Sequence, residues 1–198
     1  MREIIQAILE ESLAVKRRSI ETHSDSIVKA ADLLATCIAS GHKILIFGNG
    51  GSAADAQHLA AEFVNRFVLE RPPLPALALT TDTSILTSIG NDYSFDQVFA
   101  KQVEALGRKD DVAWAISTSG NSKNVINAVT TARKNGLVSI GMTGRNGQLA
   151  KRADLIFRVD SDSTARIQET HITIGHILCE LVDRTLFGHL ADRDAVRS

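Results

Sequence analysis

The segment Val112-Ala113-Trp114-Ala115-Ile116-Ser117-Thr118-Ser119-Gly120-Asn121-Ser122 decides the fold. Its apolar residues, 112–116, predict a buried strand, and residues 121–134 predict a helix. The turn between them carries hydroxyl side chains and no Lys or Arg. Free backbone N–H groups at a helix N-terminus suit an anion, and hydroxyl donors add to them. We therefore predict that residues 117–122 bind a phosphate group, although Ser and Asn are also common helix caps.

Apolar strands alternate with helices along most of the chain. Strands are predicted at residues 43–47, 76–79, 112–117, 138–143 and 155–159. Helices are predicted at residues 52–67, 83–88, 95–105, 121–134 and 164–187. Strands that are apolar throughout and separated by helices are typical of a parallel sheet covered on both faces. The predicted fold class is α/β, a doubly wound five-stranded parallel sheet flanked by helices, as in flavodoxin-like folds.

Two extra N-terminal helices are predicted ahead of this alternation. Residues 3–21 and 25–40 each place apolar residues at helical spacing, and Gly41 suits a C-terminal stop. We predict that this helical pair packs against another subunit; the alternative is that it caps the sheet edge. The chain is expected to form a single domain with three parts, the helical pair 1–40, an α/β core 41–188 and a polar tail 189–198.

The composition of the chain argues against several classes of protein. A formal net charge of −1 in 198 residues disfavours direct nucleic-acid binding through bulk charge. No apolar run approaches the length of a transmembrane helix, and the amphipathic, acidic N-terminus is unlike a signal peptide. Cys37 and Cys179 lie in apolar helical contexts, which predicts reduced, buried thiols. We expect a cytoplasmic protein with no membrane partner and no direct nucleic-acid partner.

Two further polar loops are predicted at the same edge of the sheet. In a doubly wound sheet, ligands bind beyond the carboxyl ends of the strands. Residues 48–52 (Gly-Asn-Gly-Gly-Ser) and 90–92 (Gly-Asn-Asp) are expected there. Glycine lets the backbone approach a ligand closely. Together with residues 117–122, these loops predict a ligand with several oxygens, such as a sugar phosphate.

A dinucleotide is the competing ligand for the first of these loops. Residues 48–53 fit the G-x-G-x-x-A fingerprint. That fingerprint requires an acidic residue at the end of the second strand, about 20 residues further on. Glu70 has the right spacing but lies in a connection before the prolines, and Asp82 is too distant. The sugar phosphate is therefore the favoured ligand.

His58 and Glu62 form a second candidate site. They are four residues apart in a predicted helix and share a face, where an imidazole and a carboxylate can hold a divalent metal. A solvated surface pair is the alternative. The last helix adds polar candidates within an apolar frame, namely Arg166, Gln168, Glu169, His171 and His176. Because Gln168 and His176 lie about 12 Å apart along a helix axis, both reach one ion only at full stretch or from different subunits.

The hydroxyl-rich turn, combined with Gly-Asn-Gly-Gly-Ser, Gly-Asn-Asp and Arg-Ile-Gln-Glu, resembles the phosphoheptose isomerase (sedoheptulose 7-phosphate isomerase) family of SIS domains. The similarity extends over residues 1–188. It implies a cytoplasmic homotetramer with zinc-containing active sites between subunits, one Zn²⁺ per subunit. It also implies conversion of D-sedoheptulose 7-phosphate to D-glycero-D-manno-heptose 7-phosphate through a metal-assisted enediol. That reaction is the first step of ADP-heptose and lipopolysaccharide core biosynthesis.

The resemblance also implies roles for individual residues of this chain. The implied metal ligands are His58, Glu62, Gln168 and His176, with Glu62 as catalytic base and His176 as catalytic acid. The implied substrate-binding residues are Asn49, Gly50, Gly51, Ser52, Glu62, Asn91, Asp92, Ser117, Thr118, Ser119, Ser122 and Gln168.

A second hypothesis comes from a related SIS protein, a tetrameric regulator that binds the replication initiator DnaA. Segments such as Asn65-Arg66-Phe67 resemble it. That relative lacks the carboxylate and the imidazole at the positions of Glu62 and His176, and this chain has both, which favours the enzyme. Another sugar-phosphate-binding SIS protein is the third hypothesis. Ala165 departs from the isomerases, in which an acidic residue often precedes Arg166.

Overall fold

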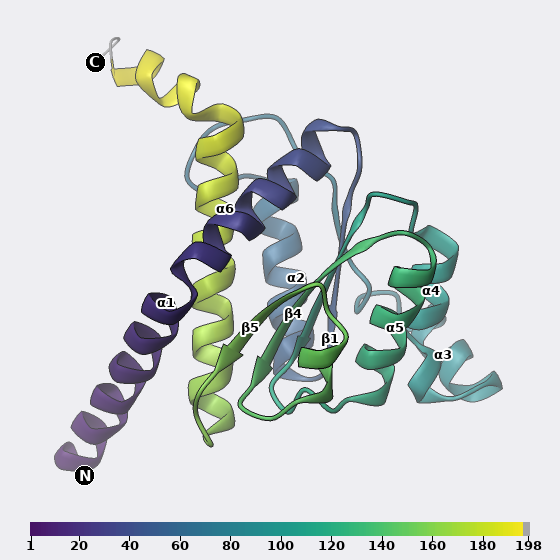
Figure 1. Ribbon diagram of the computed structural model, residues 1–198, viewed down its shortest axis with the longest axis horizontal. Helices are drawn as coiled ribbons and strands as arrows, with labels where there is room; N and C mark the ends of the chain where they lie inside the picture. The colour runs from purple at the N-terminus through teal and green to yellow at the C-terminus, as the bar shows by residue number, and fades with distance from the viewer. Residues whose placement is uncertain (196–198) are drawn as a thin grey trace.

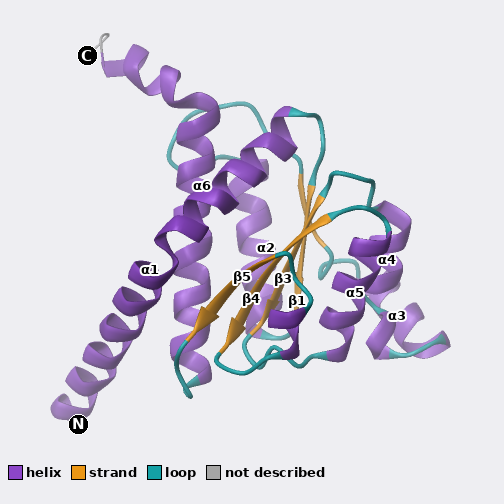
Figure 2. Ribbon diagram, in the orientation of Figure 1, coloured by secondary structure: helices purple, strands orange, loops and turns teal. Residues whose placement is uncertain are grey.

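The computed structural model describes the backbone of residues 1–195 and the side chains of residues 1–188. A central sheet is covered by helices on both faces, and the long helices α1 and α6 lie on one side of it (Figure 1, Figure 2). The strands are β1 (Ile44–Gly48), β2 (Ala76–Ala78), β3 (Val112–Ser117), β4 (Val138–Gly144) and β5 (Leu155–Val159). The α-helices are α1 (Arg2–Ala39), α2 (Gly51–Val64), α3 (Thr83–Asp92), α4 (Ala100–Leu106), α5 (Lys123–Lys134) and α6 (Thr164–Ala195). Two 3₁₀ turns are η1 (Phe95–Gln97) and η2 (Gln148–Lys151).

The strands follow the order β2-β1-β3-β4-β5, and each neighbouring pair is parallel. This confirms the predicted doubly wound five-stranded sheet. Every residue of β1 and β3 is buried, which explains why their sequences are continuous apolar runs. The strand order reverses beside β1, whose carboxyl end adjoins that of β3. Such a switch point is where open α/β sheets bind their ligands.

Hydrophobic residues form two layers on opposite faces of the sheet. Alternate residues of β1 point into each, because side chains alternate along a strand. Ile44 and Ile46 join the layer beneath α1, α2 and α6, and Leu45 and Phe47 join the layer beneath α3, α4 and α5. Both cysteines are buried free thiols, as predicted.

The N-terminal region is one continuous helix of 38 residues, so the prediction of two helices was wrong. The second helix was predicted to begin at residue 25, but the side chain of the preceding Ser24 donates to the Glu21 carbonyl oxygen at 3.0 Å within one helix. His23 also anchors this point, since its Nε2 lies 2.9 Å from the Arg158 carbonyl oxygen on β5. Contact with α6 and β5 therefore keeps the helix continuous past residue 25 (Figure 1).

The region after β2 also departs from the prediction. Helix α3 continues to Asp92 through Gly90, which does not take a positive φ, so Gly90-Asn91-Asp92 ends a helix instead of forming a loop. The helix predicted at 95–105 is split into η1 and α4. The split has a tertiary cause. The Asp96 carbonyl accepts from the Asn127 amide on α5 at 3.0 Å, and the Gln102 amide donates to the Leu79 carbonyl oxygen after β2 at 3.0 Å.

The final helix is longer than predicted. It runs to Ala195, so the polar tail expected at 189–198 begins as helix, and residues 196–198 lie outside the described part of the chain. Among the described residues, no helix combines the length and apolar character needed to cross a membrane.

Candidate active site

The hydroxyl-rich turn joins β3 to α5, where the sequence predicts it. The Oγ of Ser117 lies 3.1 Å from the Oγ of Ser122 and accepts from the N–H of Gly120 at 3.1 Å. The Oγ of Ser119 accepts from the N–H of Asn121 at 3.2 Å, while Thr118 is half-buried. Within the described chain, the N-cap Ser122 makes no side-chain bond to the α5 backbone. The first N–H groups of α5 therefore face the turn beside several hydroxyls, which suits a phosphate group.

Gly120 makes this turn possible. Its φ is +63°, in the region that favours glycine. A Cβ at this position would overlap the Oγ1 of Thr143 and lie 2.5 Å from the Cα of Gly147. The turn is thus pressed against the loop that follows β4.

The first glycine loop lies beside the hydroxyl turn. Asn49 and Asn124 exchange two amide hydrogen bonds, each 2.9 Å long, which join the loop to the first turn of α5. Gly50 has a φ of +56° as the N-cap of α2. Ser52 is buried close over Gly48, where a Cβ would lie 2.8 Å from the Ser52 Cβ. Because β1 and β3 are adjacent, the N-termini of α2 and α5 meet at one edge of the sheet.

A compact group of ligand-type side chains lies further along α2. The Nε2 of His58 is 3.3 Å from the Oε1 of Glu62 and 2.8 Å from the Nε2 of His176 on α6. These three residues, called the His58 cluster below, offer one atom each within 4.8 Å of one another. Two imidazole nitrogens and a carboxylate oxygen are ligands that Zn²⁺ prefers. The donor set therefore fits a zinc ion, while the metal itself stays a prediction.

The surroundings of His176 are partly apolar. Its imidazole stacks on Phe67, with ring centroids 5.4 Å apart and an interplanar angle of 24°. Partial burial lowers the pKa of His176, and the neighbouring His58 lowers it further, against the opposing effect of Glu62 and Asp55. This histidine therefore gives up a proton more readily than a solvated one.

Gln168 lies apart from the His58 cluster within one chain. Its Nε2 donates to the Oδ1 of Asp55 at 3.3 Å, and a Cβ on Gly51 would lie 2.5 Å from that nitrogen. Gln168 thus lies against the first turns of α2, beside the glycine loop. Eight residues of helix separate it from His176, about 12 Å along the axis. Among the described residues, the side chain of Gln168 bonds to Asp55 and makes no hydrogen bond to the His58 cluster of its own chain.

Asp55 is a site residue that the sequence prediction missed. It is 8% exposed, its Oδ2 has no hydrogen-bond partner among the described residues, and burial raises the pKa of its carboxyl. Its position three residues before His58, on the same face of α2, was the available signal.

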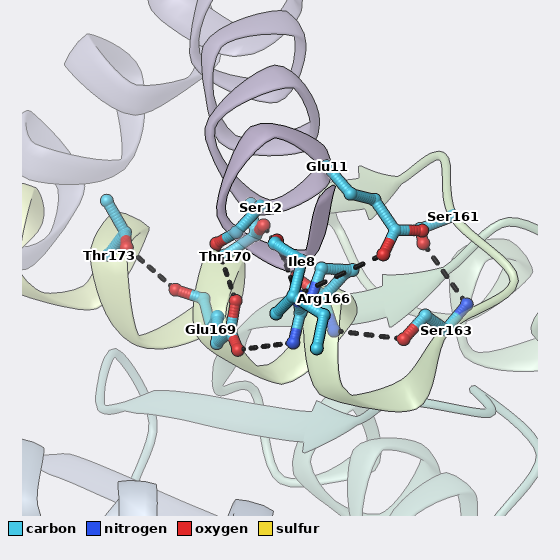
Figure 3. Close-up of polar contacts among 9 residues, drawn as sticks. All are labelled: Ile8, Glu11, Ser12, Ser161, Ser163, Arg166, Glu169, Thr170 and Thr173. Carbon is cyan, nitrogen blue, oxygen red and sulfur yellow. Dashed lines mark hydrogen bonds and ion pairs between the residues drawn. The ribbon is translucent and has the colours of Figure 1, made fainter. Parts of the chain in front are cut away.

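Arg166 and Glu169 bind α1 instead of joining the His58 cluster (Figure 3). Arg166 donates to the Ile8 carbonyl oxygen and to the Oε1 of Glu169, both at 2.9 Å. The other carboxylate oxygen of Glu169 accepts from the Oγ of Ser12 at 2.7 Å. These contacts fix the start of α6 on the N-terminal half of α1.

The remaining candidates make no hydrogen bond to either group within the described chain. Asn91 and Asp92 are exposed at the end of α3, where the Nδ2 of Asn91 donates to the Oδ1 of Asp92 at 2.8 Å. No hydrogen bond within the described chain joins them to the turn or to the His58 cluster. His171 is buried in the core, with its Nε2 3.2 Å from the Thr143 carbonyl oxygen.

Comparisons with known proteins show the family of this chain. Residues 9–144 match the SIS domain family. The chain is 59% identical over 184 residues to a phosphoheptose isomerase of Solidesulfovibrio magneticus, covering 93% of this chain and 90% of the relative. The chain belongs to the phosphoheptose isomerase family of SIS domains. A relative with the same name from Aquifex aeolicus is 55% identical, with coverage of 92% and 96%.

Solved structures of the phosphoheptose isomerase family have the same fold. The phosphoheptose isomerase GmhA of Neisseria gonorrhoeae superposes with a TM-score of 0.86 at 47% identity, covering 92% of this chain and 98% of that one. The enzyme of Francisella tularensis gives 0.88 at 41% identity, with coverage of 92% and 97%. The α/β architecture predicted from the sequence is therefore that of this family.

Gly120→Ala tests how closely the turn is packed. We expect it to lower the free energy of unfolding by about 1–3 kcal/mol more than Gly41→Ala, because the added methyl group overpacks the turn. Gly41 also has a positive φ, +80°, but a Cβ there meets nothing within 4 Å, so the backbone strain is matched. Urea unfolding measures both variants. Equal losses would mean that the turn has room for a Cβ.

His171 is expected to make stability depend on pH. Burial lowers its pKa from 6.5 to about 4, so the unfolded chain binds this proton more readily than the folded protein. Its contribution is complete above about pH 6.5 and is lost as the pH falls toward 4, by roughly 3 kcal/mol in all. Urea unfolding of His171→Gln between pH 7 and pH 4 should show a shallower decline than wild type. If the free energy of unfolding fell equally with pH in both proteins, His171 would not be the source of the pH dependence.

Proposed function

We propose that this protein is a phosphoheptose isomerase that interconverts D-sedoheptulose 7-phosphate and D-glycero-D-manno-heptose 7-phosphate. The single observation that carries the proposal is the His58 cluster, a ready set of metal-binding and proton-transferring groups in a sugar-phosphate fold. Curated relatives with that enzyme name, 54–59% identical, support it. On this proposal the enzyme acts in the cytoplasm, at the first step toward ADP-heptose and the lipopolysaccharide core.

The phosphate end of the substrate is assigned to the hydroxyl turn. Ser117, Ser119 and Ser122 offer hydroxyl donors, and the N-terminus of α5 adds backbone N–H groups with a favourable dipole. The glycine loop, with Ser52 at the start of α2, is assigned to the opposite side of the bound phosphate from the hydroxyl turn. Neutral donors hold a dianion without a buried cation, so product release is not opposed by a full ion pair.

The sugar end of the substrate is assigned to the His58 cluster, with one Zn²⁺ per subunit held by His58, Glu62 and His176. When bound, the ion polarises the carbonyl and neighbouring hydroxyl oxygens of the sugar. Glu62 and His176 would alternate between holding the ion and transferring protons: Glu62 takes the proton from the carbon beside the carbonyl, and His176 donates a proton to the carbonyl oxygen, which gives the enediol. The enediol then takes up a proton at the former carbonyl carbon and loses the proton of its other hydroxyl, which converts the ketose into the aldose.

Glu62 and His176 also favour the enzyme over the hypothesis of a replication regulator. A protein that only binds the replication initiator needs neither a carboxylate at residue 62 nor an imidazole at residue 176. Here these side chains lie around a common point, one on α2 and the other on α6. Ala165, exposed at the start of α6, bears on the efficiency of the reaction and not on its type.

We also propose that the protein forms a homotetramer with its active sites between subunits. The N-terminal half of α1 exposes a run of large apolar side chains, namely Ile4, Ile5, Ile8, Leu9 and Leu13, each 49–66% exposed. Such a face on one helix is typical of a subunit contact. Gln168 would then serve the His58 cluster of a neighbouring subunit, which accounts for its distance from the cluster of its own chain.

Glu62→Gln tests the catalytic base. The substitution keeps the size of the side chain and an oxygen ligand but removes the base, so turnover of sedoheptulose 7-phosphate should fall at least 10²–10⁴-fold, on the order of a general-base contribution. Glu70→Gln, at an exposed carboxylate in a surface pair with Arg66, is the matched control and should retain wild-type turnover. A metal chelator should abolish the wild-type activity, and added Zn²⁺ should restore it. Near-normal turnover by Glu62→Gln would refute the assignment.

Ile5→Asp tests the subunit contact. Because Ile5 is 66% exposed in the single chain, a charge there should leave the fold intact but disfavour burial of the helix face against another copy. Light scattering after size exclusion should give a tetramer for the wild type and a smaller species for the variant. Val28→Asp, on the C-terminal half of the same helix at 55% exposure, is the control and should stay tetrameric. A tetrameric Ile5→Asp protein would exclude this face as the contact.

A further inference from the structure

A buried ion pair lies beyond the His58 cluster, between the segment after α2 and helix α6. The Nε of Arg71 donates to the Oδ1 of Asp183 at 2.8 Å, and both side chains are 1% exposed. Neither residue has a place in the reaction described above. A charged pair this deeply buried calls for an explanation, because removing two charges from water is costly.

Arg71 binds the C-terminal end of α2. Its guanidinium donates to the carbonyl oxygens of Glu62 at 2.9 Å and Phe63 at 2.7 Å, and more weakly to that of Asn65 at 3.3 Å. The last turn of α2 contains no basic residue of its own, so Arg71 supplies the positive charge favoured at a helix C-terminus. One of the bound carbonyls belongs to Glu62, the carboxylate of the His58 cluster.

Asp183 brings α6 into the same network. It follows His176 by seven residues, which is close to two helical turns, so both side chains lie on the face of α6 that meets α2. Arg71 therefore ties the carbonyl of one cluster residue, Glu62, to the helix that carries another, His176.

Arg71 also fixes the connection between α2 and β2. Besides the Asn65 carbonyl at the beginning of this connection, it binds the Pro72 carbonyl at 3.2 Å. Between these two points, Phe67 stacks on the imidazole of His176. The guanidinium thus restrains the backbone of Glu62 and the aromatic ring that orients His176.

We propose that Arg71 and Asp183 are positioning residues that hold Glu62 and His176 in the geometry required for metal binding. The proposal rests on the proposed function in one respect only, that the His58 cluster is the metal site. Neither residue touches the metal or the sugar. They act through the α2 terminus, through α6 and through Phe67.

Asp183→Asn is the principal test, because the amide keeps the size of the carboxylate and removes its charge. Zinc affinity of the full-length protein is measured by competition with a chromophoric chelator, at a temperature where circular dichroism shows a folded chain. We expect the dissociation constant for Zn²⁺ to rise about 10–100-fold, the usual effect of disturbing a group that orients metal ligands.

Asp111→Asn is the matched control. Asp111 is also 1% exposed and paired, with its Oδ2 2.5 Å from the Nζ of Lys43, but it lies at the amino end of the sheet, away from the His58 cluster. The control should lose stability as well, while its zinc affinity stays at the wild-type value. Equal weakening in both variants would assign the effect to general destabilisation and overturn the proposal.

Arg71→Lys provides a second, milder variant. A lysine keeps the charge near Asp183 but cannot bind several carbonyls at once. We expect an intermediate loss of zinc affinity. With Co²⁺ in place of zinc, both site variants should shift the visible absorption bands, which report ligand geometry and not stability, and Asp111→Asn should leave them unchanged.

Failure of the inference can be told apart from failure of the proposed function. Wild-type affinity and an unchanged cobalt spectrum in both site variants would overturn the positioning role alone. If His58→Ala binds zinc as tightly as wild type, the cluster is not the metal site, and both proposals fall. Weakened binding by the site variants, with a normal control and a weakened His58→Ala, supports both.

Discussion

Helices α2 and α6 run side by side in the same direction, and at residue 175 no side chain separates them. A Cβ on Gly175 would lie 2.7 Å from a methyl carbon of Leu59, so the two helices meet at a distance that only glycine allows. Three groups of side chains in and around the site lie along this contact between α2 and α6. Near the start of α2, Gln168 of α6 bonds to Asp55. Further along α2, His176 lies beside His58 and Glu62. Beyond the end of α2, Asp183 of α6 bonds to Arg71.

This arrangement separates two tasks along one helix. The N-terminus of α2, with the adjoining hydroxyl turn, offers neutral donors and dipoles for an anion. Six residues from Ser52, about 9 Å along the axis, the same helix presents the imidazole of His58. The turn belongs to the fold in general and cannot distinguish an enzyme from a sugar-phosphate sensor. The cluster between α2 and α6 supplies the metal-binding and proton-transferring groups that the proposed reaction requires.

Much of this organisation could be predicted from the sequence, because it is encoded locally. Apolar runs such as 112–116 specify buried strands whatever surrounds them, and the spacing of His58 and Glu62 is a property of any helix. Features that depend on contacts between distant segments were not predictable in this way. The continuity of α1 depends on His23 meeting β5, and the division of η1 from α4 depends on Asn127. Asp55 and Arg71 have no distinguishing sequence pattern, and only the tertiary structure shows that they are buried.

Anomalous scattering at the zinc absorption edge, from crystals of the full-length protein grown with Zn²⁺, tests most directly whether the α2–α6 contact builds a metal site. If the cluster binds zinc, a peak is expected about 2.0–2.2 Å from the ligand atoms of His58, Glu62 and His176. A zinc peak held by other residues, or density showing these three side chains turned away from one another with no ion between them, would contradict it.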